Sequence, residues 1–418
     1  MIFKGNQLKN LISIFLFILF LSSQSISQSA NNFVVKSLNV YTTDNKTSFP
    51  VVTKNNKLVI EFDVQAGFTP NMNVVFRFCD NGWTPTRNTF LVNPLRSTGY
   101  FIDFEELKVT IEDAHFHSMS TFPDDKGDVE FPFSGKWRFY LTDTQDTSIV
   151  YGTGKFYIVK DDVNLDIKVK RDELENQNYW PAELAKTFNV TTDFYLPDNF
   201  YPSFVDRIEI IDNQRNYYPI IVDRNSNTLF RQFKWDANRS FTFTARDIPA
   251  GNEFRQVDLR DHNFFIAKDV KAQRDGLEFS RFFLNPLRKD LNGSKIFVDF
   301  KDDFATYLNV TFSIRPPDEV YNDLFLVGAF NDWHLSLDYR LNEEEGVYSI
   351  TIPLKRGIYD YQYVAADVVD GEIIDADWLI LEGNTWVNTK EYDVFLYYKD
   401  PDFGGYERII GYSRITTK

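Results

Sequence analysis

Cysteine is almost absent from this sequence, which holds one cysteine and four histidines in 418 residues. The single thiol, Cys79, cannot form an internal disulfide bond, and a lone cysteine in a strand-like run usually behaves as a small buried hydrophobic residue. Stability must therefore come from burial of apolar side chains. The sequence has enough of them, because 43% of its residues are hydrophobic.

The sequence also lacks the short motifs that accompany common catalytic and nucleotide sites. It contains no Gly-x-Ser-x-Gly nucleophile elbow, no phosphate-binding glycine loop and no EF-hand loop. Its 60 acidic residues show no spacing that singles out one carboxylate pair as a glycosidase dyad. We therefore expect neither enzymatic activity nor a cofactor, while calcium binding by Asp-rich turns stays open.

The scarce histidines offer one candidate metal site, at His115 and His117. Residues two apart on a strand point to the same face, so two imidazoles in this arrangement can begin a metal site. Asp113 is near, and Asp124 and Asp125 follow at some distance, but no further ligand has motif spacing. We therefore interpret both histidines as solvated or hydrogen-bonded, and expect no metal.

Long apolar runs are missing except at the N-terminus, where Leu11 to Leu21 is interrupted by a single serine. Two lysines precede this run, and small residues follow at Ser25 and Ser27, in the pattern of a signal-peptidase site. A membrane-spanning helix needs roughly 20 apolar residues. The pattern predicts a signal peptide over residues 1–27 and a mature protein in the periplasm without a lipid anchor. The alternative is a single uncleaved anchor helix.

Positive charge is in deficit, and the formal net charge is −15. Removal of a signal peptide that contains lysines and no acids would make the mature chain more negative still. Such a surface repels nucleic acid and anionic membrane faces. We therefore exclude nucleic acid as a partner and expect no direct membrane insertion.

What the sequence has in abundance is aromatic residues, with 41 Phe and 22 Tyr. Aromatic and β-branched residues favour strands, and the mature sequence shows no long apolar stripe with helical period. The strand-like runs are short and are separated by Asp, Asn, Gly and Pro, which is typical of β-sandwiches. They include 53–64, 73–78, 136–142, 154–159, 165–169, 188–194, 206–212, 218–222, 229–235, 239–245, 264–267, 279–283, 296–300, 307–312 and 408–415.

Two charged or turn-rich stretches divide these runs into three units. One stretch is Lys160-Asp161-Asp162, and the other extends from Asn285 to Ser294. The sequence thus predicts an all-β protein of three Ig-like (E-set) β-sandwich domains in series, over residues 28–160, 161–300 and 301–418, the last including a C-terminal tail.

The third unit carries the most specific local motif, Gly328-Ala329-Phe330-Asn331-Asp332-Trp333, followed by the strand Gly357 to Val364. This pair resembles the glycogen- and starch-binding sandwich family, in which a Gly-x-Phe-x-x-Trp turn precedes a Gly-x-Tyr-x-Tyr-Lys-Phe strand. The resemblance implies that Trp333 matches the first sugar-stacking Trp. Gln362 stands at the position of the family's Lys, and no Trp has the spacing of the second stacking residue. We therefore expect Trp333 to pack against its own core.

Along almost the whole mature chain run eight motifs: Phe76–Pro85, Phe116–Pro123, Phe133–Trp137, Pro249–Arg260, Gly328–Trp333, Glu382–Thr385, Phe395–Pro401 and Arg408–Gly411. In their order they resemble the periplasmic plug family of the type IX secretion system. One position departs from the family, since Asn81-Gly82 replaces Ala-Asp before a Trp.

This resemblance implies a protein that docks on the periplasmic mouth of a very large outer-membrane β-barrel, the type IX translocon, and seals its pore between export events. Candidate anchors for this partner are Trp83, Trp180 and Trp378, with core packing as the alternative role of each. A second hypothesis is a periplasmic or surface glucan-binding protein that uses Trp333. A third hypothesis is a carbohydrate-active enzyme. All three units, however, have the strand pattern of sandwiches, so no segment is left for a catalytic domain.

Overall fold

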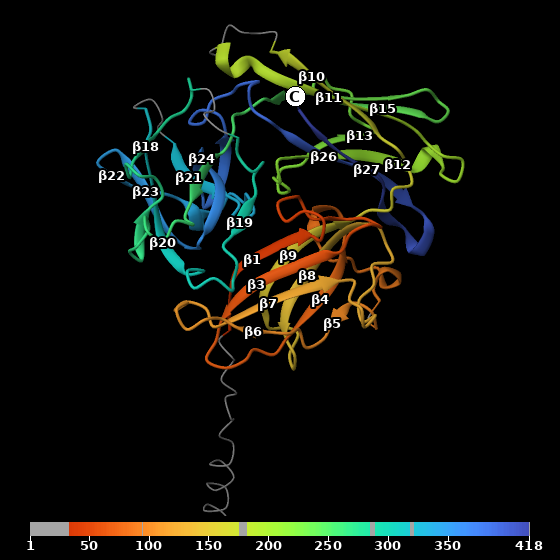
Figure 1. The fold of residues 1–418 in the computed structure, drawn as a ribbon. Helices are drawn as coiled ribbons and strands as arrows, with labels where there is room; N and C mark the ends of the chain where they lie inside the picture. Colours follow the sequence, from red (N-terminus) through yellow and green to blue (C-terminus); the bar gives the residue numbers. More distant parts are fainter. Residues whose placement is uncertain (1–32, 94, 175–181, 285–288, 318–321, 418) are drawn as a thin grey trace, which may run out of the picture.

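The computed structural model describes residues 33–93, 95–174, 182–284, 289–317 and 322–417. The expected signal peptide and Trp180 lie outside these residues. Within them the regular structure consists of strands and short 3-10 turns, so the all-β prediction is confirmed. The strands form six sheets, which pair into three sandwiches with separate cores (Figure 1). No helix in the described part of the chain is long and apolar enough to cross a membrane.

The first sandwich is held together by a core rich in aromatic residues, and its central strands are buried over most of their length. Phe76 lies at the centre of an aromatic cluster, in edge contact with Phe122, Phe131 and Phe156. One sheet contains β1 (Val34–Thr42), β3 (Leu58–Gln65), β7 (Phe116–Phe122) and β6 (Glu105–Glu106), and the other contains β2 (Val51–Val52), β9 (Val150–Ile158), β8 (Gly135–Asp143), β4 (Met72–Cys79) and β5 (Thr98–Gly99).

The second sandwich combines strands from the middle of the chain with the last two strands. Its core includes Phe194, Phe241 and Phe243, whose rings stack across neighbouring strands. One sheet contains β10 (Asp166–Glu173), β11 (Lys186–Tyr195), β15 (Ser240–Pro249) and β14 (Arg231–Trp235), and the other contains β13 (Ile220–Asp223), β12 (Val205–Asp212), β26 (Glu391–Asp400) and β27 (Tyr406–Thr416).

The third sandwich lies between these two parts of the second in the sequence. Its longest strand, β24 (Gly357–Val369), is buried over most of its length because it pairs with strands on both sides. Beside β24 lie β16 (Arg255–Asp258), β19 (Lys295–Phe297), β21 (Asp323–Gly328) and β25 (Glu372–Asp377), and the facing sheet contains β17 (Asp269–Lys271), β20 (Tyr307–Arg315), β23 (Val347–Lys355), β22 (Asn342–Glu344) and β18 (Glu278–Phe279).

The observed sheets place the domain boundaries differently from the expected series of 161–300 and 301–418. Strand β26 pairs with β12 of the second sandwich, with Ile208 opposite Leu396 and Ile210 opposite Val394. The physical reason is that the apolar face of β26 completes the core of the second sandwich. The third sandwich already begins at β16, and it is an insertion in the second. The expected strand at 264–267 is a turn followed by a bend.

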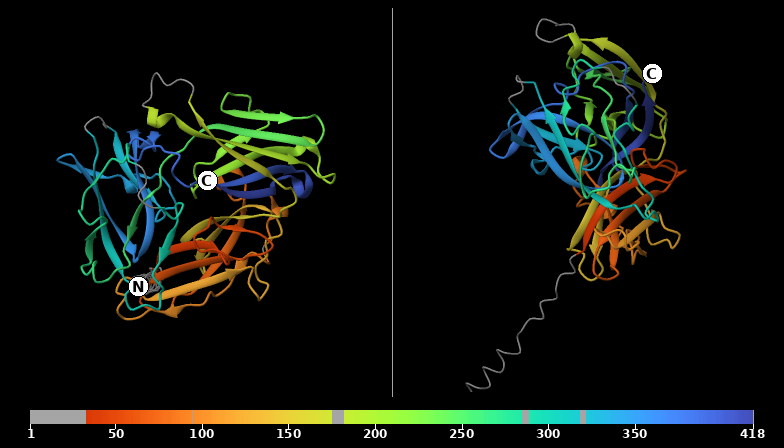
Figure 2. Two further views of the ribbon diagram at one scale, coloured as in Figure 1. Left: turned by 45° about the horizontal axis from the view of Figure 1, so that its top comes forward. Right: turned by 60° about the vertical axis from the view of Figure 1, so that its left-hand side comes forward.

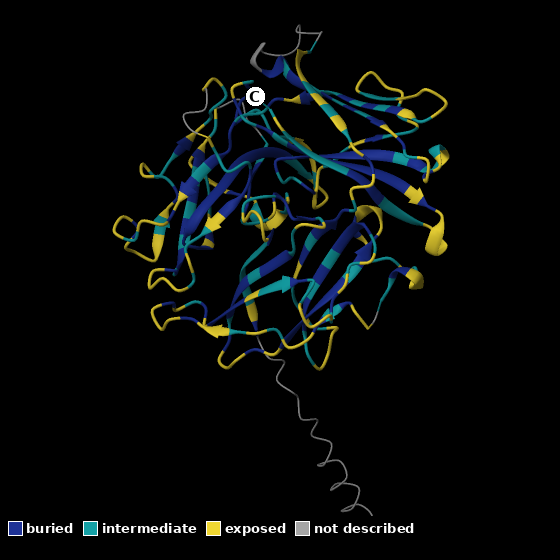
Figure 3. Ribbon diagram, turned by 45° about the vertical axis from the view of Figure 1, so that its right-hand side comes forward, coloured by how far each residue is buried: buried dark blue, intermediate teal, exposed yellow. Residues whose placement is uncertain are grey.

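The three sandwiches touch one another pairwise, as two further views show (Figure 2). In Figure 3 the strands are mostly coloured as buried, while exposed residues gather in the loops. Between the first and second sandwiches, Tyr157 stacks on Phe395 with ring centroids 4.3 Å apart. Between the first and third, Tyr307 donates a hydrogen bond to Asp63 at 2.8 Å. These contacts join all three into one body.

Two of these interfaces also contain buried ion pairs. Lys136 of β8 lies 2.9 Å from Glu209 of β12, and both side chains are almost fully buried. Lys355 of β23 lies 2.7 Å from Asp63 of β3, where both are equally buried. Removing one partner of such a pair leaves an uncompensated charge in a low dielectric, which costs about 3–5 kcal/mol. Each pair therefore penalises separation of the sandwiches that share it.

Two segments of the chain connect the second and third sandwiches, and side-chain contacts of Tyr218 also join them. Residues 250–254 lead into the third sandwich, and residues 378–390 return from it. The Tyr218 hydroxyl accepts a hydrogen bond from the backbone N–H of Leu335 at 2.9 Å, and its ring lies 5.1 Å from that of Trp378. Because both ends of the insertion are anchored, the third sandwich cannot swing freely about a single linker.

Candidate functional site

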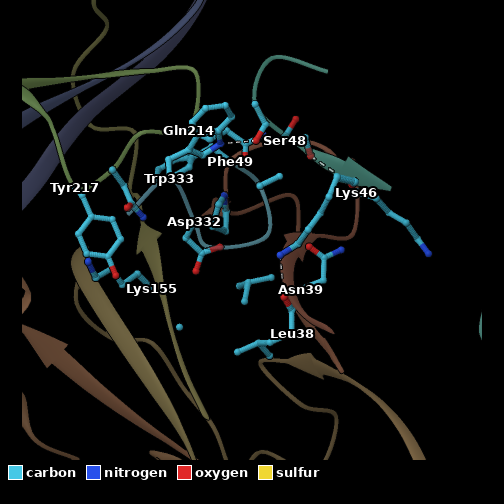
Figure 4. Close-up of a pocket in the computed structure, with 18 of the residues that line it drawn as sticks. Leu38, Asn39, Lys46, Ser48, Phe49, Lys155, Gln214, Tyr217, Asp332 and Trp333 are labelled. Carbon is cyan, nitrogen blue, oxygen red and sulfur yellow. Dashed lines mark hydrogen bonds between the residues drawn. The ribbon is translucent and has the colours of Figure 1, made fainter. Parts of the chain in front are cut away.

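A pocket lies where the three sandwiches meet, and we call it the central pocket (Figure 4). Its cavity volume is about 100 Å³. The first sandwich contributes residues of β1, β8, β9 and the loop after β1; the second contributes the loop after β12; and the third contributes the turns before β19 and after β21. A site built at a junction of this kind depends on the assembly of all three sandwiches.

The turn after β21 forms one wall of the central pocket. The backbone of Asp332 and Trp333 has positive φ angles of 51° and 60°, and the Asn331 side chain holds the turn by accepting a hydrogen bond from the N–H of Gly328 at 3.0 Å. The Trp333 indole N–H donates to the carbonyl of Gly293 at 2.7 Å. This tight turn buries the indole and leaves the Asp332 carboxylate exposed at the pocket.

The charged side chains of the pocket are four cations and one acid. The cations are Lys46, Arg138, Lys155 and Lys295, and the acid is Asp332. Among the described residues, no Asp or Glu oxygen lies within 4.0 Å of any of the four cations. A cluster of unpaired cations is unusual in a chain whose net charge is −15.

Lys155 lies against aromatic rings rather than against a carboxylate. Its Nζ is 3.3 Å from the centroid of the Tyr217 ring and 5.2 Å from that of Trp83. Burial, and then the neighbouring charge of Arg138, lowers the pKa of Lys155 to about 8, while Asp332 acts in the opposite direction. Figure 4 shows Lys155 beside Tyr217 at one side of the pocket. Cation–π contacts of this kind stabilise an ammonium by about 0.5–2 kcal/mol.

Lys295 and Arg138 also have unused hydrogen-bond donors. Lys295 is 9% exposed, and its ammonium donates one bond, to the carbonyl of Leu38 at 2.9 Å. Burial lowers its pKa, and Asp332 partly offsets this effect. Arg138 donates a long bond of 3.4 Å to the carbonyl of Trp83, while its buried Nε has no partner among the described residues. Buried donors without partners are costly.

A second, larger cavity of about 590 Å³ lies between the second and third sandwiches. Trp378 lines it and is half-buried, with Arg215 5.3 Å from its ring centroid. Beside this cavity lies a group of carboxylates, Glu253, Asp290 and Asp360. Burial raises the pKa of Asp360 to about 6, and burial with the charges of Asp360 and Glu253 raises that of Asp290 to about 8.

The tryptophans expected to bind partners occupy different environments. Trp83 is 7% exposed and packs edge-on against Tyr157, with the ring centroids 5.0 Å apart, so it is not an exposed anchor. Its loop folds inward because the indole completes the core between the first and second sandwiches. Trp333 is 1% exposed, and Trp378 is half-buried at the larger cavity. Trp180 lies outside the described residues, and the other three do not form one exposed surface.

The two histidines that suggested a metal site do not share an environment. His117 is buried, and its Nδ1 lies 2.8 Å from Asp63, while its ring stacks on Phe300. His115 is exposed and accepts a hydrogen bond from the N–H of Ala66. No cluster of three or more His, Cys, Asp or Glu suited to a metal occurs among the described residues.

Sequence reasoning missed the cations of the central pocket. Arg138 and Lys155 lie on adjacent strands of the first sandwich, Tyr217 comes from the second, and Lys295 comes from the third. These residues share no motif or spacing, and only the packing of the three sandwiches brings them together. The one local signal was the Gly328 to Trp333 turn, which forms part of the wall.

Comparison with known proteins supports the fold and gives no function. No family model and no curated protein matches this chain. The crystal structure of a hypothetical protein from Parabacteroides merdae ATCC 43184 is similar, with 19% sequence identity and a TM-score of 0.74. The match covers 91% of this chain and 97% of that one, so all three sandwiches recur there. A bacterial ice-binding adhesin of 1.5 MDa also matches, at 11% identity over 92% of this chain and 96% of that one. Its TM-score of 0.15 indicates no similarity of overall fold.

Proposed function

We propose that this protein is a non-enzymatic plug, which docks in the periplasm on the outer-membrane β-barrel of type IX secretion and closes its pore. The proposal combines the order of motifs along the chain with the architecture of the body. The observation that supports it most is that each sandwich packs against the other two, with buried ion pairs at two of the interfaces. A protein that closes a pore must be rigid, and a rigid body loses little conformational entropy when it docks.

Exposed apolar residues in loops supply candidate contacts for the barrel. Each sandwich presents some of them far from its core, and aromatic or aliphatic anchors of this kind commonly dominate reversible interfaces. They include Phe90, Leu95 and Phe101 in the first sandwich, Tyr201, Leu229 and Phe230 in the second, and Ile266, Phe283 and Leu284 in the third.

Glucan binding, the second hypothesis, relied on Trp333. Sugar stacking needs an open aromatic face, whereas this indole is 1% exposed and its N–H is bonded to the carbonyl of Gly293. Phe254 covers it with a centroid separation of 4.1 Å. The plug is therefore the better supported proposal. Electrophoresis through glycogen gels checks this choice, and we expect the same mobility as in plain gels.

Site-directed crosslinking tests the plug proposal. Cys79 is 2% exposed, and burial raises the pKa of its thiol to about 12, so the wild-type chain gives an unreactive background. Single cysteines at Leu95, Leu229 and Phe283 place a photo-crosslinker on each sandwich in turn. A matched control is Val369→Cys, an exposed strand position away from these loops.

We expect at least one of the three loop positions to capture the barrel protein from outer membranes, at a yield well above that of the control. Deletion of the protein should also make the outer membrane permeable to large antibiotics. Capture of the barrel by none of the variants, in membranes that retain other translocon components, would contradict the proposal.

A further inference from the structure

The turn η1 (Asn81–Trp83), which follows β4, contains one of the two Asn-Gly pairs in the sequence, and Asn292-Gly293 is the other. An asparagine before glycine is chemically labile, because the backbone nitrogen of the glycine can attack the side-chain amide and no Cβ hinders it. We propose that Asn81 is a site of spontaneous deamidation, which converts it to aspartate and isoaspartate. This inference is independent of the plug role.

The reaction is a ring closure followed by hydrolysis, and water is its co-reactant. The backbone nitrogen of Gly82 loses its proton to hydroxide and forms a bond to Cγ of Asn81. The bond from Cγ to Nδ2 then breaks, and ammonia leaves with a proton from water, which restores the hydroxide and gives a cyclic succinimide. Water opens this ring at either carbonyl, so the products are aspartate or, where the chain now continues through the side chain, isoaspartate.

Both groups that react at Asn81-Gly82 are accessible. Asn81 and Gly82 are exposed, and the Gly82 N–H has no hydrogen-bond acceptor among the described residues. A Cβ built on Gly82 would have no atom within 4 Å apart from its chain neighbours, so the glycine stands in open space. A free nitrogen held next to an exposed amide can approach the amide carbon with only small motions of the turn.

The second pair, Asn292-Gly293, is protected by the same criteria. Gly293 is buried, and its N–H donates a hydrogen bond to Asp360 at 3.0 Å. The carbonyl oxygen of Asn213 would lie 2.6 Å from a Cβ on Gly293, which shows how tightly this backbone is packed. Attack by the Gly293 nitrogen requires local opening, which costs free energy. The chain thus contains an internal control for the exposed pair.

A cation lies beside the oxygen that becomes negatively charged during the attack. The Lys136 ammonium is 3.5 Å from Oδ1 of Asn81 and is held in place by Glu209, which lies 2.9 Å away. When Gly82 attacks, negative charge develops on this Oδ1, and a fixed ammonium nearby stabilises the tetrahedral intermediate. The fold therefore supplies assistance that an unstructured Asn-Gly peptide lacks.

Conversion would affect the junction of the first and second sandwiches. The turn is held by a hydrogen bond from the Trp83 N–H to the Asp80 carbonyl at 3.1 Å, and Trp83 packs on Tyr157 between these sandwiches. Isoaspartate inserts one more carbon into the backbone of the turn, which then cannot keep both this bond and the position of the indole. The isoaspartate product should therefore have a Tm about 2 °C lower than the unmodified protein.

The test is incubation of the full mature chain at mildly alkaline pH, with samples taken over several weeks for peptide mapping by mass spectrometry. Each conversion replaces an amide nitrogen by an oxygen and is located by the masses of the fragment ions. In the native protein we expect Asn81 to convert at least about tenfold faster than Asn292, since only Asn292 must open first. In urea both pairs are exposed, so we expect their rates to become similar.

Two variants separate the site from the assisting cation. Asn81→Gln should abolish conversion at this position, because the longer side chain disfavours ring closure. Lys136→Met should slow the conversion of Asn81 by about threefold, and Glu209 keeps Arg207 as a partner in this variant. The double variant Lys136→Met, Glu209→Gln removes both charges of the buried pair and keeps the test valid if the single variant does not fold.

Lys155→Met is the matched control for the loss of a nearby cation. The Lys155 ammonium lies 5.2 Å from the Trp83 ring centroid of the same turn and not at the Asn81 amide. The conversion rate of Asn81 in this variant should therefore stay close to that of the wild type.

Two results would overturn the inference. One is a native protein in which Asn81 stays unconverted while both pairs convert in urea. The other is equal conversion of Asn81 and Asn292 in the native protein, which would show that the fold does not select between them. An unchanged rate at Asn81 in Lys136→Met and in the double variant would overturn the role assigned to the ammonium.

Discussion

Four lysines, three of them buried and one, Lys155, half-buried, fall into two groups, and the difference separates the scaffold from the candidate site. At the interfaces, Lys136 and Lys355 each lie within 3.0 Å of a buried carboxylate. In the central pocket, Lys155 and Lys295 have no carboxylate within 4.0 Å among the described residues. The paired lysines penalise separation of the sandwiches, while the unpaired ones are kept at a cost to stability.

The same contrast holds for buried carboxylates. Burial opposes ionisation of Asp63, but hydrogen bonding to His117 and the charge of Lys355 outweigh it and lower its pKa. Among the described residues Asp360 has no such cation, so burial raises its pKa to about 6 even though Gln256 donates a hydrogen bond to it. The charge of Asp63 at the interface is thus compensated by a cation, whereas Asp360 is held mainly by hydrogen bonds.

The largest expected effect comes from breaking an interface pair. Lys355→Met leaves Asp63 buried with only the hydrogen bonds of His117 and Tyr307. We expect a loss of about 3 kcal/mol in unfolding free energy, because an uncompensated buried charge remains. Urea unfolding measured by tryptophan fluorescence checks this value. A loss below about 0.5 kcal/mol would show that the pair does not secure the interface.

The next effect is the pH dependence caused by the unpaired carboxylates. In the folded state Asp360 and Asp290 keep their protons up to pH values of about 6 and about 8, whereas the unfolded chain loses them near pH 4. The folded state therefore binds more protons across this window, and its stability falls as pH rises from about 4 to 8.

Because each unit by which a pKa is raised contributes about 1.4 kcal/mol, this fall should be at least about 2 kcal/mol. Asp290→Asn should flatten the profile between pH 6 and 8, whereas the exposed Asp275→Asn should leave it unchanged. Thermal unfolding at half-unit pH intervals gives the profile. A wild-type profile that rises over this window would show that the two carboxyl groups ionise normally.

A smaller effect, opposite in sign to that of Lys355→Met, is expected in the central pocket. Lys295→Met should stabilise the protein by about 1 kcal/mol, because an apolar side chain of similar length replaces an unpaired buried ammonium. It loses one hydrogen bond to Leu38. Urea unfolding in chloride buffer measures the change. Destabilisation as large as that of Lys355→Met would abolish the distinction between the two groups of lysines.

The smallest effect is expected at the rim of the same pocket. Lys46 is exposed and lies 5.5 Å from the Tyr41 ring centroid. Lys46→Met should change Tm by less than about 1 °C, because exposed charges contribute little to stability. Differential scanning calorimetry of the two proteins side by side makes the comparison. A change of several degrees would mean that the unfavourable charge extends to the rim.

The sequence allowed the fold class to be predicted but not the connectivity. The alternation in 136–142 predicts a strand, and β8 spans Gly135–Asp143. The apolar face of β26 was equally visible, yet nothing in its pattern shows whether it completes the second or the third core. Strand patterns specify which side chains face inward, whereas pairing across long sequence separations is decided by the assembled sheets.

For a related reason, the sequence did not allow most of the candidate site to be predicted. Lys155 and Lys295 are ordinary lysines in their local context, and they become unusual only because the packing of the three sandwiches leaves them, among the described residues, without a carboxylate within 4.0 Å. Trp83 shows the opposite case. It looked like an exposed loop aromatic, but the neighbouring sandwich buries it against Tyr157. Burial between domains is not encoded in short-range patterns.

The central claim is that the three sandwiches move as one rigid body, and distances between spin labels test it most directly. Met119→Cys on β7, Tyr195→Cys on β11 and Ile374→Cys on β25 place exposed labels on the three sandwiches, combined in pairs. We predict a single narrow distance distribution for each pair, which broadens in Lys355→Met for the pair joining the first and third sandwiches. Broad or bimodal distributions in the otherwise wild-type protein would contradict the claim.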